Sequence, residues 1–255
     1  MSPKIAFIFL IYDKINQERI WYDFFKDINP ELYSIYIHYK IEMPQQPLLF
    51  FEKFKLNNCI QTKWGEVSLV KAQNLAIKEA LKDPLNKKFI TVSGACIPIK
   101  NFNQIYKKII ENENSYFNES IARNNLARNS PLFEKIIPFK ASQWMILSRK
   151  HAIYCTLSDK LVDLFIKVPI FADEYFYITL LKNHPIFSSE IINYPVTNTK
   201  WNIKNKMHPI EHIDISQSSL NEIFLSESFF ARKFNQNCKV GQIDLYSYVN
   251  LSTIH

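Results

Sequence analysis

Two adjacent carboxylates, Asp173 and Glu174, open an apolar run that continues to Leu180. A carboxylate that starts a helix after a loop is well placed to face a cleft, so Glu174 is the first candidate for a general base. A structural interpretation is also open, because Asp173 could be an ordinary N-cap and Glu174 a first-turn acid favoured by the helix dipole. The pair alone therefore does not decide between catalysis and capping.

Two further segments carry polar residues that could do chemistry. Residues 140–152 read Lys-Ala-Ser-Gln-Trp-Met-Ile-Leu-Ser-Arg-Lys-His-Ala, which predicts a strand over 144–147 and then a helix that Ser148 can cap. Residues 228–234 read Ser-Phe-Phe-Ala-Arg-Lys-Phe and predict a strand with two cations. Because side chains alternate along a strand, Arg232 and Lys233 should point to opposite faces.

The N-terminal part of the chain predicts the scaffold for these residues. Residues 4–11 are continuously apolar, which is typical of a strand buried on both faces of a mostly parallel sheet. Apolar residues at helical spacing over 16–28 and an alternating strand over 33–38 complete a βαβ unit. Further elements are expected as a helix ending near residue 82, a strand over 88–93, a helix over 101–110, and a closing strand and helix over 240–251.

A sheet of this kind binds ligands at the carboxyl ends of its strands. We therefore expect Ile11 and His38, which end the first two strands, to lie near a ligand pocket. A lone histidine at a strand end is also compatible with a hydrogen-bonded structural residue.

Composition limits the classes of function. The chain has 255 residues, of which 47% are hydrophobic, so it can bury a full core as one domain. Its 3 glycines are too few for a dinucleotide or Walker-type phosphate loop. The net charge of +7 suits nucleic acid, an anionic membrane surface or a phosphate-bearing small molecule, but the basic residues are scattered. A diphosphate ligand is favoured over nucleic acid.

The cysteines and the N-terminus indicate the compartment. The 4 cysteines show no CxxC and no Cys/His ligand spacing, so we interpret them as buried or free thiols in a reducing compartment. The N-terminal apolar run ends at Asp13 and Lys14, which makes it too short to span a membrane, and it lacks a small-residue cleavage site. We expect a soluble, cytoplasmic protein without a transmembrane segment.

Several short motifs together resemble the core-2/I-branching family, the inverting β-glycosyltransferases that include branching N-acetylglucosaminyltransferases and peptide xylosyltransferases. They are Ser142-Gln-Trp, Ser148-Arg-Lys-His-Ala152, Ala172-Asp-Glu-Tyr-Phe, Trp64 in residues 62–74, Cys96-Ile-Pro98, Trp201 ahead of His208-Pro209, and Ser228-Phe-Phe-Ala-Arg-Lys-Phe234. The resemblance implies an α/β, GT-A-like fold with a mostly parallel, Rossmann-like sheet flanked by helices. It also implies a donor-binding half over about 1–112 and an acceptor and catalytic half over about 113–255.

The resemblance assigns roles to individual residues. Glu174 would be the catalytic base, Trp64 would stack on a uracil unless it is a core residue at the helix entry, and Lys233 would contact the donor diphosphate unless it is a surface residue. The expected donor-binding residues are Lys233, Trp64, Ile11, His38, Ser93, Trp201 and His208. The expected acceptor-binding residues are Glu119, Arg123, Gln143, Trp144 and Asp173, although Glu119 and Arg123 are equally compatible with a solvated face.

The sequence departs from the family pattern at His38, which is followed by Tyr39-Lys40 where the family has an acid. Residues 93–95 read Ser-Gly-Ala, so the turn that carries Asp-x-Asp in most GT-A enzymes has no carboxylate for Mn²⁺ or Mg²⁺. Either no metal is bound, which the resemblance favours, or its ligands come from elsewhere. The family's second diphosphate cation has no secure match, and the candidates are Lys204, Lys206, His208 and His212.

These observations lead to one main functional hypothesis. It is an inverting glycosyltransferase, without a metal or other cofactor, that moves GlcNAc or xylose from a UDP-sugar to a hydroxyl of a glycan or protein. A catalytically silent relative that binds a glycan or nucleotide-sugar is the first alternative. A nucleic-acid-binding protein is the second, and it would show a steep salt dependence.

Overall fold

The computed structural model of the protein describes residues 2–42, 44, 46–120, 136–167, 171–201 and 208–240. Its main sheet has the order β2–β1–β3–β8–β5–β9. The strands are β1 (Lys4–Ile11), β2 (Tyr33–Tyr39), β3 (Asn86–Ser93), β5 (Ser115–Phe117), β8 (Ile146–Ser148) and β9 (Ile191–Asn193). Only β8 runs antiparallel to its neighbours in this six-stranded sheet. The predicted mostly parallel α/β fold class is therefore confirmed.

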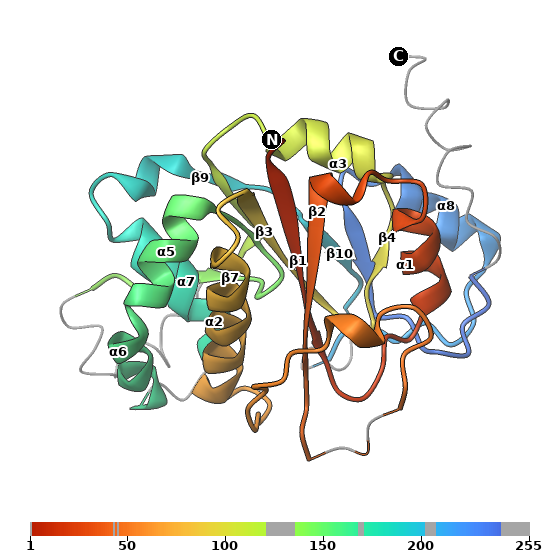
Figure 1. Cartoon of the computed structure of the whole chain (residues 1–255), viewed down its shortest axis with the longest axis horizontal. Helices are drawn as coiled ribbons and strands as arrows, with labels where there is room; N and C mark the ends of the chain where they lie inside the picture. The colour runs from red at the N-terminus through yellow and green to blue at the C-terminus, as the bar shows by residue number, and fades with distance from the viewer. Residues whose placement is uncertain are drawn as a thin grey trace.

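Helices cover both faces of this sheet (Figure 1). One face carries α1 (Glu18–Phe25), α3 (Phe102–Ile109) and α8 (Gln217–Leu225), whose buried residues form one apolar cluster. The other face carries α2 (Val67–Leu81), α5 (Arg149–Leu157) and α7 (Ala172–Lys182), which pack into a second cluster with the short α6 (Asp159–Val162). Short 3-10 helices lie at Pro30–Leu32, Glu52–Phe54, Asp163–Lys167 and Phe187–Glu190.

Strand β1 forms the centre of the core because both of its faces are apolar. Phe7 and Phe9 pack with Trp21 of α1, while Ala6 and Ile8 belong to the cluster on the opposite face. Each fully buried side chain of this size contributes about 1.5–3 kcal/mol. The periodicity of residues 4–11 thus correctly predicts a strand that is buried on both sides.

Two smaller sheets extend the architecture. A three-stranded sheet has the order β10 (Thr197–Thr199), β11 (Phe230–Arg232) and β4 (Ile97–Pro98), and a two-stranded sheet pairs β6 (Glu119–Ser120) with β7 (Lys140–Ala141). Strand β11 is parallel to β10 and antiparallel to β4, which follows β3 after a tight turn. This pairing joins the C-terminal part of the described chain to the carboxyl end of β3.

Backbone hydrogen bonds hold this junction, which we call the carboxyl edge: the segments that follow β1 and β3, and the end of β11. Gly94 N donates to Leu10 O at 3.2 Å, and Phe234 N donates to Ala95 O at 2.9 Å. A Cβ at Gly94 would approach Lys14 O to 2.5 Å, so a side chain does not fit there. Ligands of mostly parallel sheets bind at this edge.

The structure corrects some local predictions. The strand expected over 144–147 forms at Ile146–Ser148, and Ser148 occupies the N-cap position of α5 without a capping side-chain hydrogen bond. Phe171, not Asp173, is the N-cap of α7, so the capping interpretation of Asp173 is wrong. The strand and helix predicted beyond residue 240 lie outside the described residues. No helix in the described part of the chain is both long and apolar enough to cross a membrane.

Candidate active site

The first turn of α7 places Glu174 beside a cation. The Glu174 side chain is 24% exposed, and Lys140 Nζ lies 2.9 Å from its Oε2. The contact lacks the directional geometry of a hydrogen bond, so it is an ion pair held by charge. Lys140 lies on β7, a strand that pairs with β6. Glu174 is therefore a partly solvent-accessible carboxylate in a fixed position, as a general base requires.

Asp173 is built differently from its neighbour. It is 6% exposed, and its Oδ1 is buried without a hydrogen-bond partner among the described residues. Burial, together with the neighbouring Glu174 carboxylate, raises the pKa of Asp173 to about 7, although Lys140 and Arg232 oppose the shift. A buried polar atom without a partner costs about 1–3 kcal/mol, so the fold retains an unfavourable group at this point.

Arg232 is the cation that the sequence did not assign to the site. It ends β11, and its guanidinium lies 4.9 Å from the centre of the Trp144 ring. Burial lowers the pKa of Arg232, whereas the nearby Asp173 and Glu174 carboxylates act in the opposite direction. Its Nε is buried without a hydrogen bond to a described residue. Arg232 thus holds a charge and an unused donor beside the carboxylate pair.

The sequence contains a pattern that predicts an inward direction for the Arg232 side chain. On a strand, Arg232 shares a face with Phe230, which is fully buried, so alternation directs the arginine inward. The predicted opposite directions of Arg232 and Lys233 are compatible with this inward placement of the arginine. The expected acceptor residue Trp144 is 5% exposed, and its ring supports this guanidinium.

Lys233 follows directly after β11 and is partly buried. Its carbonyl oxygen accepts a hydrogen bond from His212 N at 2.7 Å, which fixes the backbone. Its ammonium makes no ion pair or hydrogen bond with the residues that the structure describes. The side chain is therefore available to an anionic ligand, and partial burial is compatible with both the diphosphate and the surface interpretation of Lys233. Lys204 and Lys206 lie outside the described residues.

Aromatic residues from three distant segments meet beside the start of α7. The Trp64 ring centroid lies 4.7 Å from that of Phe171 and 5.4 Å from that of His208. Trp64 is 52% exposed, so it is not a core residue at the helix entry. Gly65 has φ +76°, and a Cβ there would approach the Phe171 ring to 2.9 Å. Trp201, 48% exposed, forms a β-bridge with Pro209 next to His208.

Four other predicted residues have mainly internal partners. His38 is 2% exposed, its Nε2 accepts a hydrogen bond from Ile60 N at 3.0 Å, and burial lowers its pKa to about 4. This geometry supports the structural interpretation of His38. Ile11 is a core residue. Ser93 Oγ lies 3.1 Å from Cys96 Sγ, and the carbonyl oxygen of Gln143 accepts from Thr91 Oγ1 at 2.9 Å.

The expected acceptor residue Glu119 lies on β6 and pairs with Lys182 at the far end of α7, at 2.8 Å. Strand β6 adjoins β7, which carries Lys140, so Glu119 is connected to the Glu174 ion pair through one strand pairing. Arg123 lies outside the described residues. In the described ranges, no group of three or more His, Cys, Asp or Glu side chains is arranged to hold a metal.

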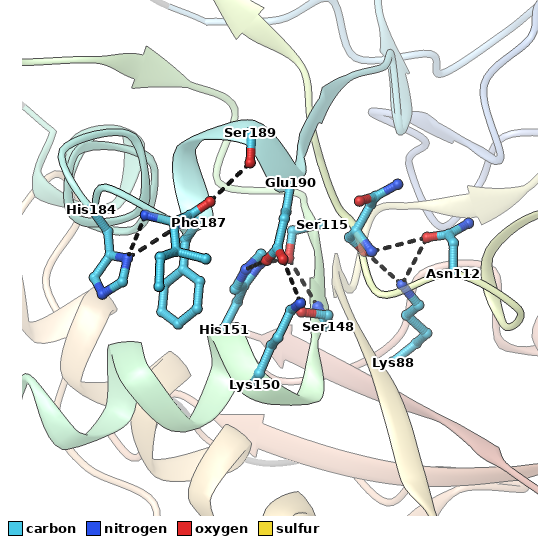
Figure 2. A network of polar contacts seen from close by, with 12 residues as sticks. Lys88, Asn112, Ser115, Ser148, Lys150, His151, His184, Phe187, Ser189 and Glu190 are labelled. Atoms are coloured by element: carbon cyan, nitrogen blue, oxygen red, sulfur yellow. Dashed lines mark hydrogen bonds and ion pairs between the residues drawn. The ribbon is translucent and has the colours of Figure 1, made fainter.

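A second polar network lies at the opposite, amino edge of the strands (Figure 2). His151 Nδ1 lies 2.7 Å from Ser115 Oγ, and His151 Nε2 lies 2.9 Å from Glu190 Oε2, which resembles a serine–histidine–acid relay. Ser115 and His151 are 0% exposed, and Ser115 Oγ also accepts from Ser148 N at 2.9 Å. No substrate can reach this hydroxyl, so the network is structural.

The mostly parallel sheet and the carboxylates and cations at its carboxyl edge define an α/β protein with a candidate acid–base site where such folds bind ligands. Residues 5–224 match the family model described as Core-2/I-Branching enzyme, and the chain belongs to this family of glycosyltransferases. It is 29% identical over 237 residues to "Glycosyltransferase BC10" of Oryza sativa subsp. japonica. That alignment covers 80% of this chain but 59% of the rice protein, so the chain spans about three fifths of its relative.

Two solved structures show more distant similarity. The apo bifunctional glycosyltransferase WbbM has a TM-score of 0.42 at 9% identity, over 91% of this chain and 46% of that one. A197 from STIV has a TM-score of 0.30 at 11% identity, over 58% of this chain and 67% of that one. Both TM-scores are low, so the family assignment depends on the sequence match alone.

Proposed function

We propose that this chain is an inverting glycosyltransferase that moves a sugar, GlcNAc or xylose first among the candidates, from a UDP-sugar to a hydroxyl of a glycan or protein. The observation that carries the proposal is the meeting of Glu174 and Asp173 with Arg232 at the carboxyl edge. Family membership supports the reaction class. The reaction needs one base for the acceptor and fixed positive charge for the leaving diphosphate, and this cluster supplies both.

In the proposed mechanism, Glu174 accepts the proton of the acceptor hydroxyl. The acceptor oxygen attacks the anomeric carbon from the face opposite the diphosphate, and the bond from that carbon to the diphosphate oxygen breaks as the new bond forms. A single displacement inverts the configuration. The proton remains on Glu174 until it is released to solvent, and the bonding electrons leave with UDP.

Arg232 and Lys233 would stabilise the charge that develops on the diphosphate. Arg232 is held in place by Trp144, and it is partly exposed beside the carboxylates, so a phosphate oxygen could accept a hydrogen bond from its guanidinium. Lys233, adjacent in the chain, would supply a second cation. Two fixed cations would do the work that a divalent metal does in other enzymes, so we propose a reaction without a metal.

The remaining site residues would bind and orient the substrates. The exposed ring of Trp64, supported by Phe171 and His208, would stack on the uracil. Asp173, which is 6% exposed, would turn its carboxyl group toward a sugar hydroxyl, which can donate to it. We also retain as proposals the cytoplasmic location, the two functional halves divided near residue 112, and the absence of a nucleic-acid partner.

The test is UDP release from a panel of UDP-sugars, with EDTA and with Mn²⁺, for the wild type, Glu174→Gln and Glu79→Gln. Glu79 is a matched control, because it is also a helical glutamate in an ion pair, with Lys82 at 2.7 Å. We expect release that persists in EDTA, falls about 10²–10⁴-fold in Glu174→Gln and stays unchanged in Glu79→Gln. Release that requires Mn²⁺ would contradict the metal-free mechanism.

A catalytically silent relative is the second candidate, and His38 is the observation that favours it. The acid that follows this histidine in the family is absent, and His38 Nε2 is occupied by Ile60 N. A silent relative would bind a UDP-sugar without releasing UDP, with or without an acceptor. Binding by calorimetry, followed by an acceptor screen under the same conditions, separates the two functions.

A further inference from the structure

A cleft with a mixed polar and aliphatic lining lies outside the candidate active site, between the edge strand β10 and one side of α8. Its volume is about 410 Å³, which is within the usual range for small-ligand sites. We call it the α8 cleft, and its lining residues are Asn198, Thr199, Lys200, Ile210, His212, Asp214, Ile215, Ser216, Ser219, Glu222 and Ile223. The proposed reaction uses none of them.

The α8 cleft contains a polar side chain, His212, that has no hydrogen-bond partner in the described part of the chain. His212 is 8% exposed, and its ring packs on Phe234 with centroids 4.9 Å apart. Its ring nitrogens form no hydrogen bond with any described residue. Burial and the nearby Lys200 ammonium lower the pKa of His212, so it is neutral at pH 7 and offers one donor and one acceptor.

The charge balance of the cleft selects the chemistry of its ligand. Asp214 and Glu222 together carry two negative charges against the single positive charge of Lys200, so the cleft disfavours phosphate and other anions. Within the described residues, its acids and histidine do not form a group able to hold a metal. A neutral ligand that both donates and accepts hydrogen bonds fits this balance.

The arrangement of polar and aliphatic groups favours a saccharide. The carboxylates accept hydrogen bonds from sugar hydroxyls, while Lys200 and the serine hydroxyls donate to them. Three isoleucines, at 210, 215 and 223, provide an aliphatic surface for the C–H face of a sugar ring. Strand β10 is at the edge of its sheet, so its outer backbone groups have no ladder partner in that sheet.

The α8 cleft is connected through backbone contacts to β11, the strand that carries Arg232, but neither Arg232 nor Lys233 lines the cleft. Thr199 of β10 is the register partner of Arg232 on β11, and His212 N donates to Lys233 O at 2.7 Å. We infer that the α8 cleft is a saccharide-binding site that holds an acceptor glycan through a sugar other than the one that reacts. This inference rests on the proposed function for its choice of substrate, but its test does not require turnover.

The experiment is saturation-transfer NMR with methyl glycosides of glucose, galactose, GlcNAc, mannose and xylose, and with the corresponding disaccharides, on the full chain. Ser219→Trp would fill the cleft, and Ser218→Trp is its matched control, because Ser218 is the preceding residue of α8 and does not line the cleft. We expect saturation transfer to at least one saccharide in the wild type, at least a tenfold loss in Ser219→Trp, and retention in Ser218→Trp.

Glu222→Gln and Glu227→Gln form a second matched pair, since Glu227 lies just beyond α8 and outside the cleft. We expect about tenfold weaker saccharide binding in Glu222→Gln alone. UDP release, measured separately, should be the same in all four variants, and its absence in the wild type would count against the proposed function only. Saturation transfer that is absent for every saccharide, or that survives Ser219→Trp, would overturn the saccharide site.

Discussion

At the amino edge of the sheet, Ser115, His151 and Glu190 form a chain of hydrogen bonds (Figure 2), whereas at the carboxyl edge Asp173 and Arg232 each keep a buried polar atom without a hydrogen-bond partner among the described residues. The residue types are similar: both clusters combine acids with basic groups. They differ in whether their buried polar atoms have hydrogen-bond partners. Both nitrogens of the His151 ring have a hydrogen-bonding partner, whereas Asp173 Oδ1 and Arg232 Nε have none among the described residues.

This difference separates structure from function on physical grounds. A satisfied buried network contributes to stability, and an unsatisfied one costs about 1–3 kcal/mol for each group. A ligand that supplies the missing partners recovers that cost only when it binds. The serine–histidine–acid pattern, which looks more catalytic, is therefore the structural cluster, and the irregular group at the carboxyl edge is the candidate site.

Arg232→Met gives the largest expected effect. It removes the cation but keeps an apolar side chain of similar length, so UDP release should fall about 10²–10³-fold. Stability in urea should change little, because methionine keeps an apolar contact with Trp144 and the wild-type Nε has no hydrogen-bond partner among the described residues. Arg19→Met is the matched control, since Arg19 is exposed and pairs with Asp23. A large loss of stability in Arg232→Met would show that Arg232 has hydrogen-bond partners within the protein, as the polar groups of the amino-edge cluster do.

Asp173→Asn tests the pH dependence at the carboxyl edge. Folded Asp173 keeps its proton up to about pH 7, whereas the unfolded chain releases it near pH 4. The folded state thus binds more protons in this window, and wild-type stability falls as pH rises through it. Asparagine has no proton to release, so Asp173→Asn should gain up to a few kcal/mol over the wild type between about pH 4 and about pH 7.

Urea denaturation at about pH 5 and about pH 8 measures this difference. Asp27→Asn, at an exposed position, is the control. An equal stability difference between Asp173→Asn and the wild type at both pH values would contradict the raised pKa of Asp173. It would mean that the Asp173 carboxyl group has a hydrogen-bond partner within the protein, like the groups at the amino edge.

Ser115→Ala addresses the amino edge. It leaves His151 Nδ1 and Ser148 N without their shared partner, so the free energy of unfolding should fall by about 1–3 kcal/mol. UDP release per folded molecule should not change. Ser189→Ala, an exposed serine in the same region, should cost under about 0.5 kcal/mol. Loss of UDP release without loss of stability would reverse the roles assigned to the two clusters.

Trp64→Ala gives the smallest effect on the list. Loss of a stacking surface should weaken UDP binding about tenfold, as measured by calorimetry, with little change in stability because the ring is half exposed. Trp64→Phe keeps an aromatic face and should recover most of the affinity. If alanine and phenylalanine bind UDP equally well, Trp64 is not the base platform.

Much of the fold was predictable because it follows from local pattern. The apolar residues 4–11 become β1, the helical spacing after residue 66 becomes α2, and residues 101–110 contain α3. Burial on one or both faces is a periodic property of a short segment, so it can be read without knowing the partner segment. The position of Glu174 at the start of a helix was accessible for the same reason.

The remainder depends on contacts between segments that lie far apart in the chain. Assembly of the sheets buries Asp173 and brings it close to Arg232. It also places Ile60 N where it donates a hydrogen bond to His38 Nε2. Trp64 meets Phe171 and His208 across more than a hundred residues. The sequence alone thus determined the family, the strand and helix pattern, and the position of Glu174 at the start of a helix, because these follow from short segments. The tertiary structure decided which buried polar groups lack a hydrogen-bond partner, because that depends on the neighbours that packing brings together.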